Sequence, residues 1–134
     1  MIERTENYDR VKRFLDAHPI RANHLFSWEM SSEVIHLIDV IDGVDTSLWI
    51  FEPVGRVNRL HTIAAPEDTE GGVRAMSWLY ENTDANVIIA PIPELLRRTQ
   101  GVVITMGMRE RRPRQGFMIY SMNRKRFDQM KEAA

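Results

Sequence analysis

Two groups of basic residues, at 109–114 and 124–126, have side chains that could bind an anionic partner. The guanidinium group of arginine forms paired hydrogen bonds with phosphates and carboxylates. Phe117 and Tyr120 lie between the two groups and could stack on nucleic-acid bases, although their alternation along a strand favours core packing. We expect a partner-binding surface for nucleic acid or an acidic protein, with a solvated strand edge as the simpler alternative. The candidate partner-binding residues are Arg109, Arg111, Arg112, Arg114, Arg124, Lys125 and Arg126.

Other patterns that indicate catalysis or metal binding are missing from the sequence. Cysteine is absent, and the four histidines are not spaced as metal ligands. Asp39, Asp42 and Asp45 recur every three residues, but the ~12-residue ligand pattern of a calcium loop is missing, which favours turn-forming roles. No nucleophile elbow, Walker loop or dinucleotide fingerprint occurs. We therefore expect no metal site.

The length and composition indicate a single domain spanning residues 1–134. A chain of 134 residues with 43% apolar and 28% charged residues can bury a core without disulfides. No apolar run approaches the ~18 residues that cross a bilayer, and the polar start MIERTENYDR does not resemble a signal peptide. We expect no membrane partner and no secretion by a signal peptide. Charge is uneven, because residues 28–94 carry three basic and twelve acidic residues, whereas residues 95–134 carry ten basic and three acidic.

Hydrophobic periodicity predicts an α/β fold with a mixed sheet and helices on both faces. Helices are expected at 8–18, 73–83 and 94–106, the last one capped by Gly107, and a short helix in the tail. Strands are expected at 25–30, 34–41, 47–51, 58–65, 86–93 and 116–122, with 108–114 a strand or loop. Asp42-Gly43 predicts a turn, and Glu52 to Gly55 a strand break. The apolar run 86–93 is typical of a strand buried on both faces, as in a parallel pair.

Four segments of the C-terminal half resemble a known family. They are the helix VRAMSWLYENT, the strand NVIIAPIPE, the pair Gly107-Met108 and the strand GFMIY. In these segments the chain resembles the GNAT acyltransferase superfamily, especially the small GNAT-like proteins of tailed bacteriophages. The resemblance implies a mixed, mostly antiparallel sheet flanked by helices, and an acetyl-CoA site in the loop before the first of these helices.

The resemblance places the coenzyme loop at residues 68–73, where the family pattern is [Gln/Arg]-x-x-Gly-x-[Gly/Ala]. In that pattern, N–H groups at a helix N-terminus cradle the diphosphate. Here only Gly71 matches, because Asp68 replaces the donor and Val73 the small residue. Each acid–phosphate pair at ~5 Å costs roughly 3 kcal/mol before screening at a dielectric of ~20, and the helix dipole offsets roughly 1–2 kcal/mol. Repulsion therefore outweighs the dipole unless the acidic side chains turn away, which favours helix capping by Asp68 or Thr69. If the loop does bind the coenzyme, the candidate residues are Asp68, Thr69, Gly71, Gly72 and Arg74.

Two further family features bear on catalysis. The Asn that the family usually has after the buried strand is missing from Pro91-Ile92-Pro93-Glu94. Val103 stands where the family has a proton-donating tyrosine. Glu52 and His61, and by location Glu94, remain as candidates for a general base.

These departures favour a non-catalytic GNAT-like protein of a phage. It would act in virion or head assembly, with other assembly proteins as partners and no cofactor, in the host cytoplasm or the virion. The first alternative is an acetyl-CoA-dependent N-acetyltransferase acting on an amine. The second is a nucleic-acid-binding module that uses the basic C-terminal third.

Overall fold

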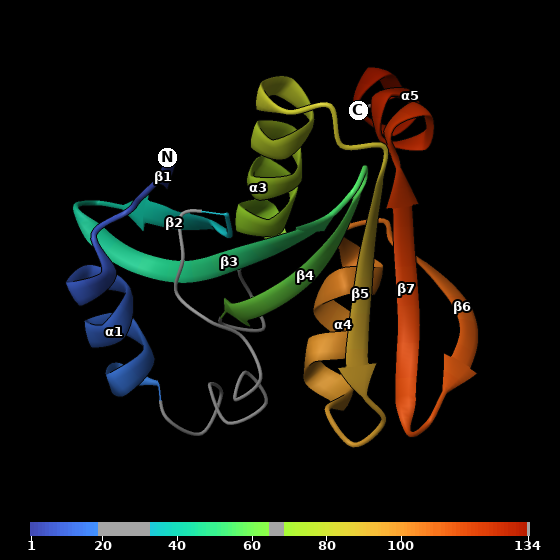
Figure 1. Ribbon diagram of the computed structural model, residues 1–134, viewed down its shortest axis with the longest axis horizontal. Helices are drawn as coiled ribbons and strands as arrows, with labels where there is room; N and C mark the ends of the chain where they lie inside the picture. Colours follow the sequence, from blue (N-terminus) through green and yellow to red (C-terminus); the bar gives the residue numbers. More distant parts are fainter. Residues whose placement is uncertain (19–32, 65–68, 134) are drawn as a thin grey trace.

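The computed structural model describes residues 1–18, 33–64 and 69–133 (Figure 1). Its strands are β1 (Ile2–Arg4), β2 (Ile35–Ile41), β3 (Val44–Val54), β4 (Val57–Ala64), β5 (Val87–Pro93), β6 (Arg109–Arg114) and β7 (Phe117–Asn123). Its helices are α1 (Tyr8–Ala17), α3 (Thr69–Asn82), α4 (Arg97–Thr105) and α5 (Arg124–Ala133). The predicted strand at 25–30 lies outside the described residues.

The described strands form one seven-stranded sheet in the order β1-β2-β3-β4-β5-β7-β6. All neighbouring strands are antiparallel except β4 and β5, which run parallel as predicted for residues 86–93. That parallel pairing joins only three residue pairs, from Val57–Val87 to Arg59–Ile89. Beyond Arg59, β4 continues with β3 alone, β5 continues with β7 alone, and the two strands diverge (Figure 1).

Helices cover both faces of the sheet, as the sequence predicts. On one face, which we call the α1 face, Val11 and Phe14 pack with Ile38, Leu48 and Ile50. On the opposite face, α3 and α4 cover the larger core, which includes Trp49, Phe51, Leu60, Met76, Leu79, Ile88, Val103 and Tyr120. Together the two layers give the chain apolar surface to bury on each side of the sheet, the main favourable term in folding.

Several element boundaries differ from the sequence prediction. Glu52 does not break a strand, because β3 pairs with β4 as far as Val54–Val57, and the turn falls at Gly55, whose φ is +65°. Pro53 is tolerated because β2 pairs with β3 only as far as Phe51, which leaves that side of β3 as an edge.

Helix α3 begins at Thr69, so Thr69 is helical and does not precede the helix as an N-cap. Helix α4 begins at Arg97, three residues later than expected, while Gly107 follows it at φ +97° as predicted.

The strand β5 is apolar throughout but is buried on one face only. Ile88, Ala90 and Ile92 are buried against α3 and α4, whereas Val87, Ile89, Pro91 and Pro93 are partly exposed. The prediction of burial on both faces is therefore wrong.

A buried ion pair joins β2 to α3. The side chain of Asp39 is fully buried, and the guanidinium of Arg74 donates to both its oxygens, at 3.1 Å from Nε and 2.6 Å from Nη2. The amino group of Met1 lies 3.4 Å from the same carboxylate. A carboxylate without water needs such partners, so Asp39 and Arg74 fix the start of α3 relative to the sheet.

Two helical glycines should respond oppositely to alanine. A Cβ on Gly72 would collide with the buried side chain of Met106, reaching its Cε at 2.7 Å and its Cγ at 2.8 Å, whereas Gly101 is exposed with nothing within 4 Å. We expect Gly72→Ala to lower the unfolding free energy by about 1 kcal/mol, since overpacking outweighs helix propensity. Gly101→Ala should raise it by about 0.5–1 kcal/mol. Urea unfolding measures both, and equal effects would contradict the close approach of α3 to α4.

Candidate active site

A carboxylate–imidazole pair lies at the point where β4 leaves β5. Nε2 of His61 is within hydrogen-bond distance of Oε1 of Glu52. The register explains the pairing, because Ile50 faces His61 and Glu52 faces Arg59, so Glu52 and His61 are diagonal neighbours on one face. Since Ile50 packs against α1, the pair lies on the α1 face. His61 follows the last β4–β5 pair by two residues.

The surroundings of His61 favour its neutral form. Burial lowers the pKa of the imidazole below its usual value near 6.5, and the charge of Arg59 lowers it further, although Glu52 opposes both. The His61 side chain is 11% exposed and that of Glu52 29%. When Nε2–H donates to the carboxylate, the lone pair resides on Nδ1, which can accept a proton. The pair has the composition of a general base with its orienting carboxylate.

The electrostatics of this pair can be measured without any substrate. We expect a nuclear magnetic resonance titration of the His61 ring protons to give a midpoint below 6.5, because burial disfavours the charged imidazolium. Glu52→Gln should lower this midpoint further, since the carboxylate favours the protonated form. Asp84→Asn, the same change at an exposed residue, should leave it unchanged. An upward shift in Glu52→Gln would contradict the pairing.

The start of α3 forms a second candidate region, on the opposite face of the sheet. Glu70, Val73 and Arg74 of α3, with Thr105 of α4, line an open pocket of about 420 Å³. The first-turn N–H groups of a helix lack intrahelical partners and favour anions. Asp68, predicted as a coenzyme ligand, lies outside the described residues.

The other predicted coenzyme residues have roles within the fold. Gly71 and Gly72 are both buried in α3, and Gly72 allows the close approach of Met106. Arg74 is bound to Asp39 and lies 3.7 Å from Glu70 through Nη1. A phosphate in this pocket would lie near the guanidinium of Arg74, which already donates to Asp39, and near the backbone amides at the start of α3. It would also meet the carboxylate of Glu70, which is 89% exposed and able to turn away. The residues therefore fit a coenzyme diphosphate, with Glu70 weakening its binding.

The predicted partner-binding residues of α5 separate into two kinds. Arg124 donates to the carbonyl oxygens of Tyr80, Thr83 and Ala85, at 2.5, 2.8 and 3.0 Å, and so caps the end of α3. Arg126 donates to the carbonyl oxygens of Gly107 and Ser121. Both guanidinium groups are thus used inside the domain, whereas Lys125 is exposed.

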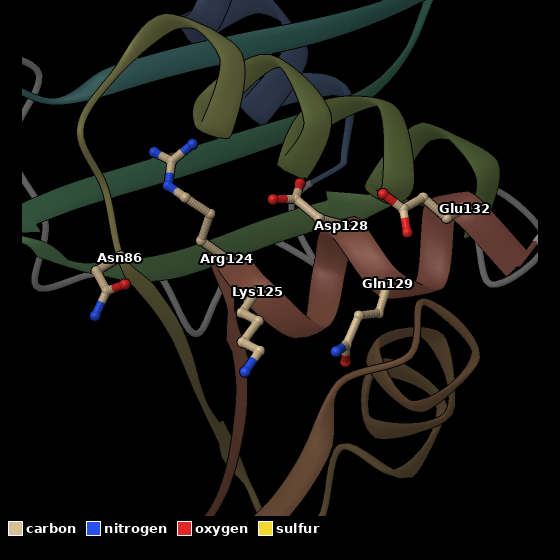
Figure 2. Close-up of a pocket in the computed structure, with 6 residues that line it drawn as sticks. All are labelled: Asn86, Arg124, Lys125, Asp128, Gln129 and Glu132. Atoms are coloured by element: carbon tan, nitrogen blue, oxygen red, sulfur yellow. The ribbon is translucent and has the colours of Figure 1, made fainter.

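A pocket of about 400 Å³ lies beside α5 (Figure 2). Arg124 and Asp128 point toward α3, while Lys125 and Gln129 point to the opposite side. Because these side chains diverge, they do not converge on one ligand.

The arginines of β6 lie at the edge of the sheet. Every residue of β6 is exposed, including the predicted partner-binding residues Arg109, Arg111, Arg112 and Arg114. Glu94 lies at the end of β5, where its N–H donates to Gly116, and is exposed. Within the described ranges, no group of three acidic or histidine side chains could hold a metal ion. None of the helices in the described part is long and apolar enough to cross a bilayer.

Comparison with solved structures identifies the fold. The spermidine N-acetyltransferase of Vibrio cholerae, solved with CoA and spermine, matches with a TM-score of 0.74 at 12% identity, covering 95% of this chain and 96% of that one. The N-acetyltransferase PseH of Campylobacter jejuni matches with a TM-score of 0.68 at 8% identity. The match covers 92% of this chain and 97% of that one. The aminoglycoside acetyltransferase AAC(6')-Ib, solved with coenzyme A and kanamycin, matches with a TM-score of 0.62 at 11% identity. The match covers 74% of this chain and 72% of that one. No protein-family model and no curated sequence matches the chain. The chain has the fold of the GNAT N-acetyltransferases.

The sequence analysis names Glu52 and His61 as separate candidates for a general base, but it does not predict that they form a pair. A two-residue turn at Gly55-Arg56 fixes the β3–β4 register and would have paired them. The contact of Arg74 with Asp39 has no comparable signal, because it depends on how α3 packs against β2.

Proposed function

We propose that this protein transfers an acetyl group from acetyl-CoA to an amine, with the Glu52–His61 pair as general base. The main support for the proposal is the position of this pair in the fold. It lies beside the diverging ends of β4 and β5, while the pocket at the start of α3, lined by Arg74 and Glu70, lies on the other face of the sheet. Three acetyltransferases with this fold support the reaction class.

The chain's own residues suit the proton transfer that the reaction requires. An alkylamine is an ammonium ion at pH 7 and must lose a proton before its nitrogen can attack a carbonyl carbon. Neutral His61 accepts that proton at Nδ1, and the carboxylate of Glu52 stabilises the imidazolium that forms. Acetyl-CoA, when bound, supplies the thioester whose acetyl group passes to the nitrogen. The first-turn amides of α3 and Arg74 would hold its diphosphate.

Coenzyme binding tests the proposal independently of the acceptor. We expect titration calorimetry with CoA to detect binding, and Glu70→Gln to tighten it two- to tenfold at low salt, because one repulsive charge is removed. Glu81→Gln, an exposed carboxylate at the other end of α3, is the matched control and should not change affinity. Absence of binding at millimolar CoA in both the parent and Glu70→Gln would overturn the proposal.

A coenzyme-free binding module is the second candidate, and the position of Arg74 favours it. Its guanidinium already serves Asp39 and Glu70, which leaves the start of α3 poor in unshared positive charge. A GNAT-like assembly protein of a phage, bound to other virion proteins, would have no need of the coenzyme. Such a protein would neither bind CoA nor transfer acetyl groups to a panel of amines that includes a polyamine, an aminoglycoside and an amino sugar.

A further inference from the structure

Within the described residues, α1 packs on β2 and β3, and no described helix packs on the α1 face over β5, β7 and β6. Along β7, Tyr120 and Met122 are buried on the α4 side, while Ile119 and Ser121 are half-buried and Phe117 is 42% exposed. The pairing of β6 with β7 sets Arg109 opposite Ser121, Arg111 opposite Ile119 and Arg114 opposite Phe117. Paired residues project to the same side of a sheet. This surface, here called the arginine face, therefore consists of Arg109, Arg111, Arg114 and Phe117.

The charges of the arginine face are not neutralised within the described chain. No carboxylate of the described residues forms an ion pair with Arg109, Arg111 or Arg114, whereas Arg10 pairs with Glu3 and Asp45. Arg126 lies beside the same strand, and its pKa is lowered by burial and by the charges of Arg109 and Arg111. Several like charges are thus held close together, which costs free energy unless an anion joins them.

Protection of the sheet edge does not account for so many arginines. Pro113 lacks an N–H group, and the register shift between Arg111 and Arg114 interrupts the ladder, so the edge is already poor at pairing with another strand. Lysine or glutamate would serve equally in that role. The arginine face instead combines guanidinium groups with an exposed aromatic ring.

We propose that the arginine face binds single-stranded nucleic acid. Arg109 and Arg111 recur two residues apart on one strand, about 6.8 Å, a spacing that suits successive phosphates of an extended strand. Phe117, at the turn end of the same ribbon, offers a flat ring on which a base can stack. A duplex keeps its bases stacked inside and would leave Phe117 unused. The site is independent of the acetyl-transfer proposal, because it needs neither the Glu52–His61 pair nor the start of α3.

Fluorescence anisotropy with labelled single-stranded oligothymidylate and oligouridylate tests the proposal. We expect binding at 50 mM salt that weakens as salt rises, with a log–log slope of about −2 for three phosphate contacts at ~0.7 each. The double variant Arg109→Ala/Arg111→Ala should make this slope shallower by about 1.4. Phe117→Ala should weaken binding about five- to a hundredfold while leaving the slope unchanged, and Phe117→Trp should restore it. Comparison of the two oligonucleotides distinguishes DNA from RNA.

Matched controls separate this site from general attraction of polyanions. The double variant Lys12→Ala/Arg13→Ala removes two exposed charges from α1 and should leave the affinity within twofold. Circular dichroism shows whether each variant is folded. The proposal is overturned if no binding occurs at 50 mM salt, if both double variants weaken binding equally, or if polyglutamate of equal charge competes as well as the oligonucleotide. In the last case the surface would be one for acidic proteins.

Discussion

Replacing His61 by glutamine should lower kcat/KM for acetyl transfer by about 100- to 10,000-fold, the usual range for loss of a positioned general base. Glutamine retains polarity and size but cannot accept the ammonium proton. The affinity for CoA should be unchanged, because His61 lies on the α1 face and the start of α3 lies on the other. Steady-state kinetics across pH 5–9 measures the effect, and the limb of the parent profile that rises below pH 6.5 should vanish in the variant.

Two further variants test whether the loss of activity is specific to the Glu52–His61 pair. Glu52→Gln should also lower kcat/KM, by a smaller factor, since the imidazolium loses its partner but His61 remains. Asp84→Asn makes the same chemical change at an exposed residue of the α3–β5 connection and should leave turnover unaffected. Turnover within threefold of the parent in His61→Gln would exclude His61 as the base.

Removing the guanidinium of Arg74 should lower the unfolding free energy by about 3 kcal/mol. Arg74→Ala leaves the buried carboxylate of Asp39 with the amino group of Met1, at 3.4 Å, as its one charged partner among the described residues, and breaking a buried pair from one side costs about 3–5 kcal/mol. We place the loss at the lower end because Arg74 is itself 35% exposed. Denaturant unfolding monitored by tryptophan fluorescence measures it.

A double-mutant cycle isolates this interaction. Asp39→Ala/Arg74→Ala should cost less than the sum of the two single changes, since neither charge is then left without its partner. Arg13→Ala, which removes an exposed guanidinium from α1, should stay within about 0.5 kcal/mol of the parent. Additive single effects would show that Asp39 and Arg74 do not interact.

Much of the fold could be predicted because local patterns and long-range packing agree. Asp42-Gly43 predicts the β2–β3 turn, and both residues have the positive φ, +52° and +76°, that a two-residue hairpin loop demands. The alternation of residues 117–122 correctly assigns the side chains of β7 to two faces, and Tyr120 is buried as expected. The core packing expected for Phe117 is wrong, because its side chain lies on the opposite face and is 42% exposed. Strand β1, with three residues, is too short to carry a periodic signal and was not foreseen.

The candidate site was less predictable, for identifiable reasons. Pro53 indicates a strand break at Glu52, but the strand continues to Val54 and the chain turns at Gly55, so the local pattern does not reveal the pairing of Glu52 with His61. The roles of Arg74 and Arg124 depend on contacts between residues 35 to 44 positions apart, which no local pattern reports.

The short parallel pairing of β4 with β5 has a mechanical consequence. Every other strand boundary inside the sheet is antiparallel and several of them run for seven or more residue pairs, but the two halves of the sheet meet over three pairs only. If force were applied to the two halves of the sheet through β3 and β7, the seam from Val57 to Arg59 should separate first, because fewer residue pairs join it than join β3 to β4 or β5 to β7. The backbone amides of that seam should likewise exchange with deuterated solvent sooner than those at the centre of β3.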